Sequence, residues 1–438
     1  MTTNIKQQII YTFEKTNFNP LMPNIKNNIQ RIKDVTQYLF KWFLISLMVG
    51  VLSGSASAFF LVSLDFVTQY RENNLWLIAL LPLGGLIIGL MYHYLGKEVV
   101  KGNNLILDEF HQPQQTIPIK MTPLVLLGTL ITHLFGGSAG REGTAVQMGA
   151  SLADQLNQWL PLTKTDRKII LITGISGGFA SVFGTPLAGA IFALEVLVVG
   201  QILYAGLFPS LLTALVANYT CHAFNVGHTQ YQVPLVPELS HYNLLWIVIA
   251  GILFGLTAWL FSKSAHFWTQ LFQTKIKYPP LRPVVGGVIL SLVVWLTSTY
   301  EFIGLGIPSI VNAFTTPNFG YEFLIKILFT TFTLGAGFKG GEVTPLFFIG
   351  ATLGSALSLI MPLPIALLAA MGFVAVFAGA TNTPLACTLM GIELFGMETS
   401  VFIGLACVIA YLSSGHQGIY GSQIIKSKKH HQQELENL

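Results

Sequence analysis

Apolar stretches broken by glycine or proline dominate this chain of 438 residues. They lie at about 39–67, 76–95, 122–136, 169–199, 203–219, 244–262, 284–298, 323–335, 346–361, 364–379, 384–395 and 400–413. Several are shorter than the ~20 residues that a straight membrane-spanning helix needs. Irregular backbone is tolerated inside a membrane only where protein or a water-filled cavity surrounds it. We therefore predict an all-α polytopic membrane protein with many tilted and broken helices.

Composition supports this class and argues against others. Hydrophobic residues make up 52% of the chain and charged residues 10%, whereas soluble domains carry about 25% charged residues. A net charge of +4 is too small to indicate nucleic-acid binding. The sequence contains no HExxH, paired nucleophile and base, or cofactor loop, so we expect neither an enzyme nor a cofactor. The three cysteines and the histidines near Cys221 lack metal-site spacing, so we expect no metal and a solvated loop for those histidines.

Basic residues at both ends indicate the orientation. Residues 1–36 are polar and contain five lysines and arginines, and the tail at 426–438 begins with Lys426, Lys428 and Lys429. The positive-inside rule then predicts that both termini are cytoplasmic. We assign residues 1–36 to a cytoplasmic N-terminal segment, 37–425 to the transmembrane domain, and 426–438 to a cytoplasmic tail. No apolar region follows the basic residues as in a cleavable signal peptide.

The membrane domain contains an internal duplication. Thr185-Pro-Leu-Ala precedes Glu195 by the same spacing as Thr383-Pro-Leu-Ala precedes Glu393, at an offset of 198 residues. The segment at 143–152 also resembles that at 343–353, at an offset of 201 residues. We predict halves at about 37–222 and 243–425, with the ligand site at their interface near the midplane. The equivalence of the two glutamates favours a structural role, such as hydrogen bonding at helix ends.

A charged pair interrupts the small, apolar stretch at 137–151. Gly140, Arg141, Glu142, Gly143 and Thr144 occur there in sequence. The glycines allow backbone to approach a small ligand, and a helix predicted at 144–156 would place Glu142 at a helix N-terminus, which favours anions. The carboxylate can then occupy an anion site until it is displaced or protonated. The alternative is a glutamate that caps its own helix, although ionisable groups at membrane depth are functional candidates by default.

These residues carry a family resemblance. GREGTAVQ at 140–147 resembles the GREGP-x-VQ signature of the CLC family of chloride channels and anion/proton antiporters. Further resemblance lies at 183–195, 337–354 and 415–423, the last of which places the family's pore tyrosine at Tyr420. The resemblance spans roughly residues 40–425. It implies a CLC-like inverted repeat, a homodimer with one pore in each subunit, and a multi-pass location in the cell inner (plasma) membrane.

Departures from the family pattern resemble its fluoride/proton antiporter branch. Asn103 replaces a serine of the first anion motif, and the second motif contains Glu342 and Thr344. Where chloride antiporters have an inner proton-transfer glutamate, this chain has Val196. We expect Glu342 to take over that proton role.

Fluoride is small and strongly hydrated, so a selective site must replace water with directed donors. Candidate anion ligands are Asn103, Thr344, Tyr420, backbone N–H groups near Val343, and the ring edge of Phe348. Arg141 is expected to anchor the loop, with Gly140, Gly143 and Thr144 supporting it. The alternatives are helix caps for the asparagine and threonine, a membrane-interface tyrosine, and a core or lipid-facing phenylalanine.

The resemblance implies fluoride export from the cytoplasm in exchange for protons. Glu142 would admit the anion when protonated and block it when charged, and an adjacent anion would favour protonation of Glu342. A chloride/proton antiporter or a passive anion channel of the same fold remains an alternative at this point. Expected partners are fluoride and protons, possibly chloride, and the lipid bilayer.

Overall fold

The structure, a computed structural model, describes residues 22–429, with side chains described from residue 27. Residues 1–21 of the predicted N-terminal segment and 430–438 of the tail lie outside the described residues. The chain divides into two units, residues 1–45 and 46–438. The described part of the first unit is the beginning of a helix that continues into the second, across the predicted domain boundary at residue 36.

The first half of the chain contains eight α-helices among the described residues. They are α2 (Met22–Glu72), α3 (Leu81–Tyr94), α4 (Asn103–His111), α5 (Met121–Leu134), α6 (Glu142–Trp159), α7 (Lys164–Phe183), α8 (Pro186–Glu195) and α9 (Leu207–Ala223). Short 3-10 helices lie at Leu75–Leu80, Lys97–Val99 and Tyr204–Gly206.

The second half repeats this order. Its α-helices are α10 (His241–Lys275), α11 (Leu281–Thr297), α12 (Ile307–Asn312), α13 (Glu322–Gly335), α14 (Val343–Leu357), α15 (Ile365–Thr381), α16 (Pro384–Phe395) and α17 (Ser400–Ser413). Short 3-10 helices lie at Tyr300–Phe302 and Met397–Thr399, and β1 (Val198–Val199) pairs in parallel with β2 (Ile424–Ile425). Because α5 to α9 match α13 to α17 in order and spacing, the predicted duplication is confirmed.

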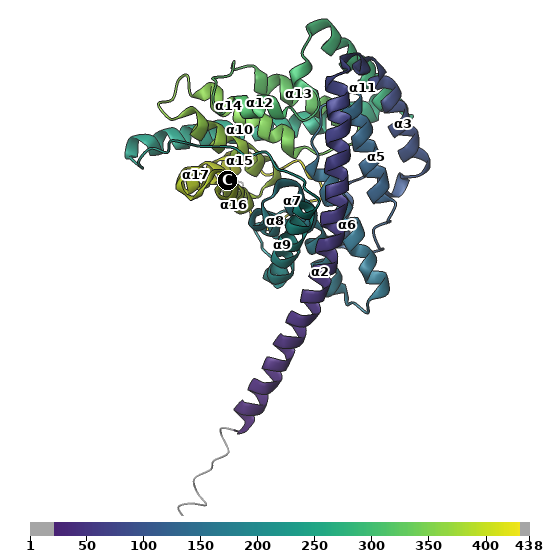
Figure 1. Ribbon diagram of the computed structural model, residues 1–438, viewed down its shortest axis with the longest axis vertical. Coiled ribbons are helices and arrows are strands. Elements are labelled where there is room, and N and C mark those ends of the chain that lie inside the picture. The colour runs from purple at the N-terminus through teal and green to yellow at the C-terminus, as the bar shows by residue number, and fades with distance from the viewer. Residues whose placement is uncertain (1–21, 430–438) are drawn as a thin grey trace, which may run out of the picture. The chain divides into compact units, whose positions relative to one another are not determined.

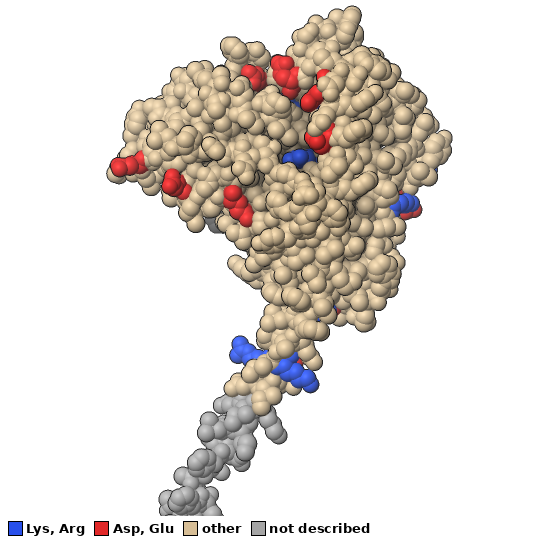
Figure 2. Space-filling model, viewed as in Figure 1, with Lys and Arg blue, Asp and Glu red and all other residues tan. Residues whose placement is uncertain are grey.

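Helix lengths agree with the predicted broken segments. Within the described residues, three helical segments are long and apolar enough to cross a membrane, at Asn27–Glu72, Leu75–Tyr94 and His241–Lys275. Other apolar helices, such as α8 and α16, are shorter than a straight span requires. Figure 2 shows that charged side chains are sparse on the visible face and that several acidic ones surround a hollow.

The apolar stretch at 169–199 is two helices rather than one. Gly184 has a left-handed conformation (φ +73°) that ends α7. Pro186 follows as the first residue of α8, where a missing N–H costs nothing. The second repeat breaks in the same way at Asn382 (φ +61°), before Pro384. These breaks leave the N-termini of α8 and α16 inside the protein.

Glycine allows the central helix pairs to pack with their backbones in contact. A Cβ added to Gly350 in α14 would lie 2.0 Å from the carbonyl oxygen of Gly372 in α15. In the first repeat, a Cβ on Gly149 in α6 would lie 2.3 Å from the carbonyl oxygen of Gly174 in α7. Such close approach is typical of membrane helices, whose association depends on packing and hydrogen bonds.

The two repeats meet along equivalent helices. α8 contacts α16, α3 contacts α11, and α6 contacts α14; Figure 1 shows α8 and α16 side by side. The carboxylate of Glu393 accepts hydrogen bonds from the amides of Leu187 and Ala188 at 2.9 and 2.8 Å. Reciprocally, Glu195 accepts from Leu385 and Ala386 at 3.1 and 2.8 Å. The predicted helix-end role of these two glutamates is therefore confirmed, and each one caps the helix of the opposite repeat.

Candidate functional site

The site forms where the two repeats exchange backbone hydrogen bonds. The amide of Gly140 donates to the carbonyl of Gly341 at 2.6 Å, and the amide of Gly341 donates to Gly140 at 2.8 Å. This antiparallel bridge joins equivalent positions of the two halves, as a local two-fold relation between the repeats requires. It brings together the N-termini of α6 and α14, which begin two residues after each glycine. Gly140 has no room for a side chain, because an added Cβ would lie 2.9 Å from the Gly341 oxygen.

Glu142, the first residue of α6, is fully enclosed at this junction with 1% exposure. Its carboxylate accepts from the Thr344 amide at 3.0 Å and from the Arg141 amide at 3.1 Å. The Thr344 hydroxyl donates to the other carboxylate oxygen. Two of these donors thus belong to the start of α14, where Val343 is the first residue, and not to the helix that Glu142 itself begins. A helix N-terminus and a hydroxyl are a typical anion site, and here a carboxylate occupies it.

Arg141 lies beside this carboxylate. Its Nε is 3.6 Å from a Glu142 oxygen, and its side chain is 20% exposed. This is an ion-pair distance without a hydrogen bond, so anchoring of the loop by Arg141 stays a prediction. The remaining motif threonine, Thr144, shares a 2.7 Å hydrogen bond with the Thr129 hydroxyl of α5, which ties the start of α6 to the preceding helix.

Glu342 and Asn103 both lie close to Gly143. A Cβ on Gly143 would lie 3.0 Å from the Asn103 amide nitrogen and 3.6 Å from Oε2 of Glu342. Among the described residues, neither Glu342 Oε2 nor Asn103 Oδ1 has a hydrogen-bond partner, although both atoms are buried. Buried polar atoms without partners are costly, so this pair indicates a place for a proton, a water molecule or a small ion.

The alternative roles as helix caps do not hold for these residues. α4 begins at Asn103 with Gly102 as its N-cap, and within residues 22–429 no side chain caps it. The N-cap residue of α14, Glu342, makes no capping hydrogen bond, and the Thr344 hydroxyl donates to Glu142. Both polar groups therefore face the junction between the repeats.

Tyr420 separates two cavities. A small one of about 20 Å³ is lined by Tyr420, Asn103, Val196 and five apolar residues, a volume close to that of one water molecule. A larger one of about 500 Å³ lies on the other side of the tyrosine. Tyr420 is itself 8% exposed. The position at which this chain departs from chloride antiporters, Val196, thus lines the small cavity.

The segment that carries Tyr420 donates hydrogen bonds to three other parts of the chain. The amide of Ile419 donates to the Ala380 carbonyl in α15 at 2.8 Å. The Gln423 side chain donates to the Val196 carbonyl at 2.8 Å, and the Ser422 amide donates to the Asn104 side chain in α4 at 3.0 Å. Pairing of β1 with β2 adds a further link to the first repeat. These contacts fix the tyrosine next to α4, the helix that begins at Asn103.

Phe348 has a different environment from the expected anion contact. It is fully buried in α14, and the ammonium of Lys326 lies over its ring, 5.0 Å from the ring centre. Lys326 also donates to the carbonyls of Phe302 and Gly304 at 3.0 and 2.8 Å. The recorded contacts of the Phe348 ring are therefore a cation–π pair and an edge contact with Phe302, which are packing interactions. Sequence reasoning missed Lys326, although a lysine within an apolar stretch was a signal.

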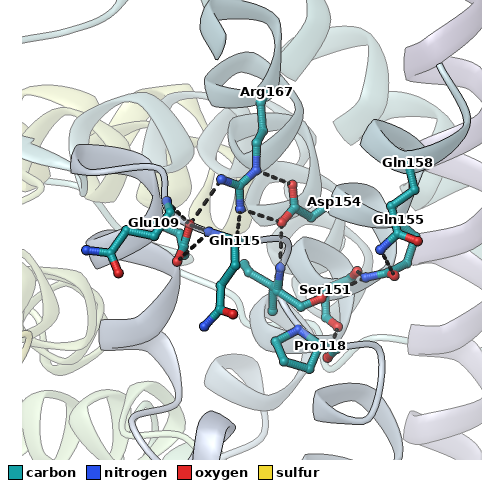
Figure 3. Close-up of polar contacts among 10 residues, drawn as sticks. Glu109, Gln115, Pro118, Ser151, Asp154, Gln155, Gln158 and Arg167 are labelled. Carbon is teal, nitrogen blue, oxygen red and sulfur yellow. Dashed lines mark hydrogen bonds and ion pairs between the residues drawn. The ribbon is translucent and has the colours of Figure 1, made fainter. Parts of the chain in front are cut away.

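A buried ion network was also missed (Figure 3). Arg167 at the start of α7 donates to both carboxylate oxygens of Asp154 at 2.8 Å and to Glu109 at 3.0 Å. It also donates to the Gln115 carbonyl, and the Ile117 amide donates to Asp154. The network ties α4, α6 and α7 together. Of these helices, α4 begins at Asn103 and α6 begins at Glu142. Three charged residues in largely apolar surroundings were the available signal, but their spacing does not reveal that they meet.

Of the histidines near Cys221, His222 and His241 are exposed as predicted, whereas His228 differs from the predicted solvated loop. Cys221 and His222 belong to α9, and the cysteine is buried. His228 is half-buried, with its ring 5.3 Å from that of His222. It packs against Gly184, where an added Cβ would meet its ring at 2.6 Å. This histidine fills the space beside the break between α7 and α8.

Comparison with known proteins places this geometry in context. A protein named chloride/fluoride channel protein from Pseudomonas syringae pv. tomato is 51% identical over 404 residues, covering 91% of this chain and 89% of the relative. The crystal structure of a CLC-type fluoride/proton antiporter matches with a TM-score of 0.86 at 36% identity, covering 88% of this chain and 98% of the other. A slow cyanobacterial chloride/proton antiporter matches with a TM-score of 0.75 at 20% identity, covering 86% and 96%, and shares the fold.

The family model described as voltage gated chloride channel matches residues 84–415, which include the Gly140–Gly341 bridge, both glutamates and both repeats. The predicted fold class, a helical CLC-like membrane protein, is confirmed by these matches. This chain is therefore a multi-pass membrane protein that belongs to the CLC family of voltage-gated chloride channels.

Proposed function

We propose that this protein exchanges fluoride for protons and exports fluoride from the cytoplasm. The observation that carries the proposal is the position of the Glu142 carboxylate, which occupies an anion site built by the N-terminus of α14 and Thr344. Two similar proteins, one named a chloride/fluoride channel protein and one solved as a fluoride/proton antiporter, support the choice of ion.

Coupling follows from competition for one site. The charged Glu142 carboxylate and a fluoride ion are both anions that accept hydrogen bonds, so they compete for the amide and hydroxyl of Thr344. Protonation removes the charge of Glu142 and weakens its hold on these donors, so the side chain leaves and fluoride enters. A proton bound at Glu142 thereby becomes a condition for fluoride passage.

Glu342 is the proposed second proton carrier. A buried carboxyl oxygen without a partner is accommodated at lower cost as a neutral acid. As an acid, Glu342 can donate a hydrogen bond to fluoride near Gly143, and it releases the proton once the anion has left. Val196, at the position of the inner glutamate of chloride antiporters, cannot carry a proton, which favours this assignment over a chloride/proton antiporter.

The proposed anion path runs from the larger cavity past Tyr420 to Asn103 and then to Thr344. The amide of Asn103 and the hydroxyls of Tyr420 and Thr344 are the donors along it, with backbone amides at the start of α14. Phe348 stays a proposed ring-edge contact for the anion, beside the contacts that its ring makes with Lys326 and Phe302. We further propose a homodimer in the inner membrane, with both termini cytoplasmic and the larger cavity on the cytoplasmic side.

The decisive experiment is ion efflux from proteoliposomes that contain the full-length protein and are loaded with fluoride or chloride, with external pH recorded simultaneously. Fluoride efflux with coupled proton uptake and little chloride movement is the expected result. Comparable chloride efflux would overturn the choice of ion. Efflux without proton movement would instead identify a passive channel, in which Glu142 acts as a gate alone.

A further inference from the structure

Lys339 lies in the loop that leads into α14, three residues before Glu342. Its ammonium lies over the ring of Tyr92 in α3, 4.1 Å from the ring centre, and donates to the Val100 carbonyl oxygen at 3.4 Å. The stem of the side chain packs against α5, because a Cβ added to Gly128 would lie 3.0 Å from its Cβ and Cγ. Contacts with separate parts of the first repeat therefore fix the position of this charge.

The acidic group whose charge acts on Lys339 is Glu342. Two glycines, Gly340 and Gly341, separate the two residues, so their Cα atoms lie within about 11 Å of each other. Among the described residues, no carboxylate forms an ion pair with Lys339. The two charges therefore interact across a gap, and this leaves the Glu342 carboxyl free of a direct bond to the ammonium.

The other groups around Glu342 disfavour a negative charge on it. Glu142 at the start of α6 acts on it as a like charge. Tyr420, on which the charges of both glutamates act, is a neutral phenol. Oε2 of Glu342 has no hydrogen-bond partner in the described structure. Of the described groups whose charge acts on this carboxyl, Lys339 is the positive one.

We propose that Lys339 is the counter-charge of Glu342 and sets how readily this carboxyl releases its proton during exchange. The inference rests on the proposed function, in which Glu342 carries a proton. A carboxyl that faces the charge of Glu142 without a positive neighbour would stay protonated, and the cycle would stop. The fixed ammonium stabilises the ionised form once the anion has left and the proton has passed to water. Lys339 is therefore a positioning residue, because it acts on the proton through Glu342.

Uncharged variants of Lys339 separate its charge from its contacts. Lys339→Gln removes the charge and keeps an N–H donor for the Val100 carbonyl, whereas Lys339→Met removes both. In proteoliposomes that contain the full-length protein, both variants should move the midpoint of the pH dependence of fluoride exchange to higher pH. We expect a shift of about one pH unit, the scale for unit charges about 10 Å apart at an effective dielectric constant of about 20. The sign follows because ionised Glu342 loses its counter-charge.

Two further variants serve as controls for this shift. Lys339→Arg keeps the charge and should keep the original midpoint. Lys101→Met removes an exposed lysine from the segment next to Val100, where it pairs with Asp108 at 2.8 Å, and should also leave the midpoint unchanged. A lower rate in both uncharged variants without a shift of the midpoint would identify a purely structural lysine and overturn the proposal.

The shift must also depend on Glu342. In a protein that already carries Glu342→Gln, the additional change Lys339→Gln should cause no further shift of the midpoint. An equal shift in that background would assign the effect to another titrating group and contradict the inference.

Infrared difference spectroscopy measures the protonation of Glu342 without transport. The carboxylic acid C=O band that is lost in Glu342→Gln reports on this residue. Its titration should move to higher pH in Lys339→Gln and stay in place in Lys101→Met. The same titration in both variants would rule out a counter-charge at Lys339.

These outcomes distinguish the inference from the proposed function. If the unaltered protein carries chloride or moves no protons, the proposed function fails, and the infrared titration still tests whether Lys339 acts on Glu342. If fluoride exchange is intact and the titration of Glu342 does not respond to Lys339, only the counter-charge is wrong.

Discussion

The repeats meet at two glutamate-containing junctions that differ in symmetry. At the α8–α16 junction, Glu195 and Glu393 make the same pair of backbone hydrogen bonds to opposite helices. At the α6–α14 junction, the backbone bridge is symmetric, but the side chains are not. Glu142 accepts hydrogen bonds from the start of α14, whereas Glu342 Oε2 has no partner among the described residues.

A comparison of equivalent positions in the two repeats explains this difference. Gly140 pairs with Gly341, so Glu142 corresponds to Val343, and Arg141 corresponds to Glu342. One half carries a glutamate at the helix start, and the other carries its glutamate one position earlier. A symmetric junction strengthens the scaffold. An asymmetric one leaves one carboxyl bound and another unsatisfied, which fits the proposed proton-coupled site.

The largest expected effect is that of Glu142→Gln. We expect proton-coupled fluoride transport to fall by on the order of 100-fold, the scale seen when a proton-transfer group is removed, because the amide cannot alternate between charged and neutral forms. Simultaneous fluoride and pH recordings from proteoliposomes measure this. Retained proton coupling in the variant would remove the functional distinction between the two junctions.

Glu342→Gln should have the next largest effect. We expect coupled transport to fall about 30-fold, within the range of coupling free energies between sites, because the variant removes the proposed proton carrier. The unfolding temperature should change little, since Oε2 forms no hydrogen bond that the substitution would break. Normal coupling together with a lower unfolding temperature would indicate a structural glutamate instead.

Thr344→Val tests the donor that Glu142 and the anion are proposed to share. The lost hydroxyl bond to a charged group should reduce fluoride transport roughly 10-fold, the low end for such a bond. Thr352→Val is the matched control in the same helix, because the Thr352 hydroxyl donates to the Phe348 carbonyl of its own helix. The rate of fluoride transport per folded protein should therefore fall more in Thr344→Val than in Thr352→Val. Equal losses in the two variants would show that Thr344 contributes only to packing.

The smallest effects on transport should come from the symmetric junction. Glu195→Gln and Glu393→Gln each lose part of a helix-end interaction, so each should destabilise the fold by about 1 kcal/mol. Thermal unfolding in detergent measures the loss, and transport per folded protein should stay unchanged in both. If Glu195→Gln alone abolished proton coupling, the junctions could no longer be divided into scaffold and site.

Much of the fold follows from local sequence patterns. Apolar stretches of limited length predict short membrane helices, and the repeated Thr-Pro-Leu-Ala segments predict both the duplication and the equivalence of Glu195 and Glu393. The charged pair at Arg141 and Glu142 stands out because ionisable groups are costly at membrane depth. The break at Gly184 was not located within the apolar run at 169–199, although Gly184 and Pro186 are signals for a helix end and a helix start.

The sequence alone determined the helical membrane class, the two repeats and the candidacy of Glu142. Only the tertiary structure decided which groups hold that carboxylate, because the Gly140–Gly341 bridge joins residues 201 positions apart. It likewise decided that Arg167 meets Asp154 and Glu109, and that Lys326 covers the ring of Phe348. Hydrogen bonds and ion pairs depend on distances of a few ångströms, and spacing along the chain does not set such distances between separate helices.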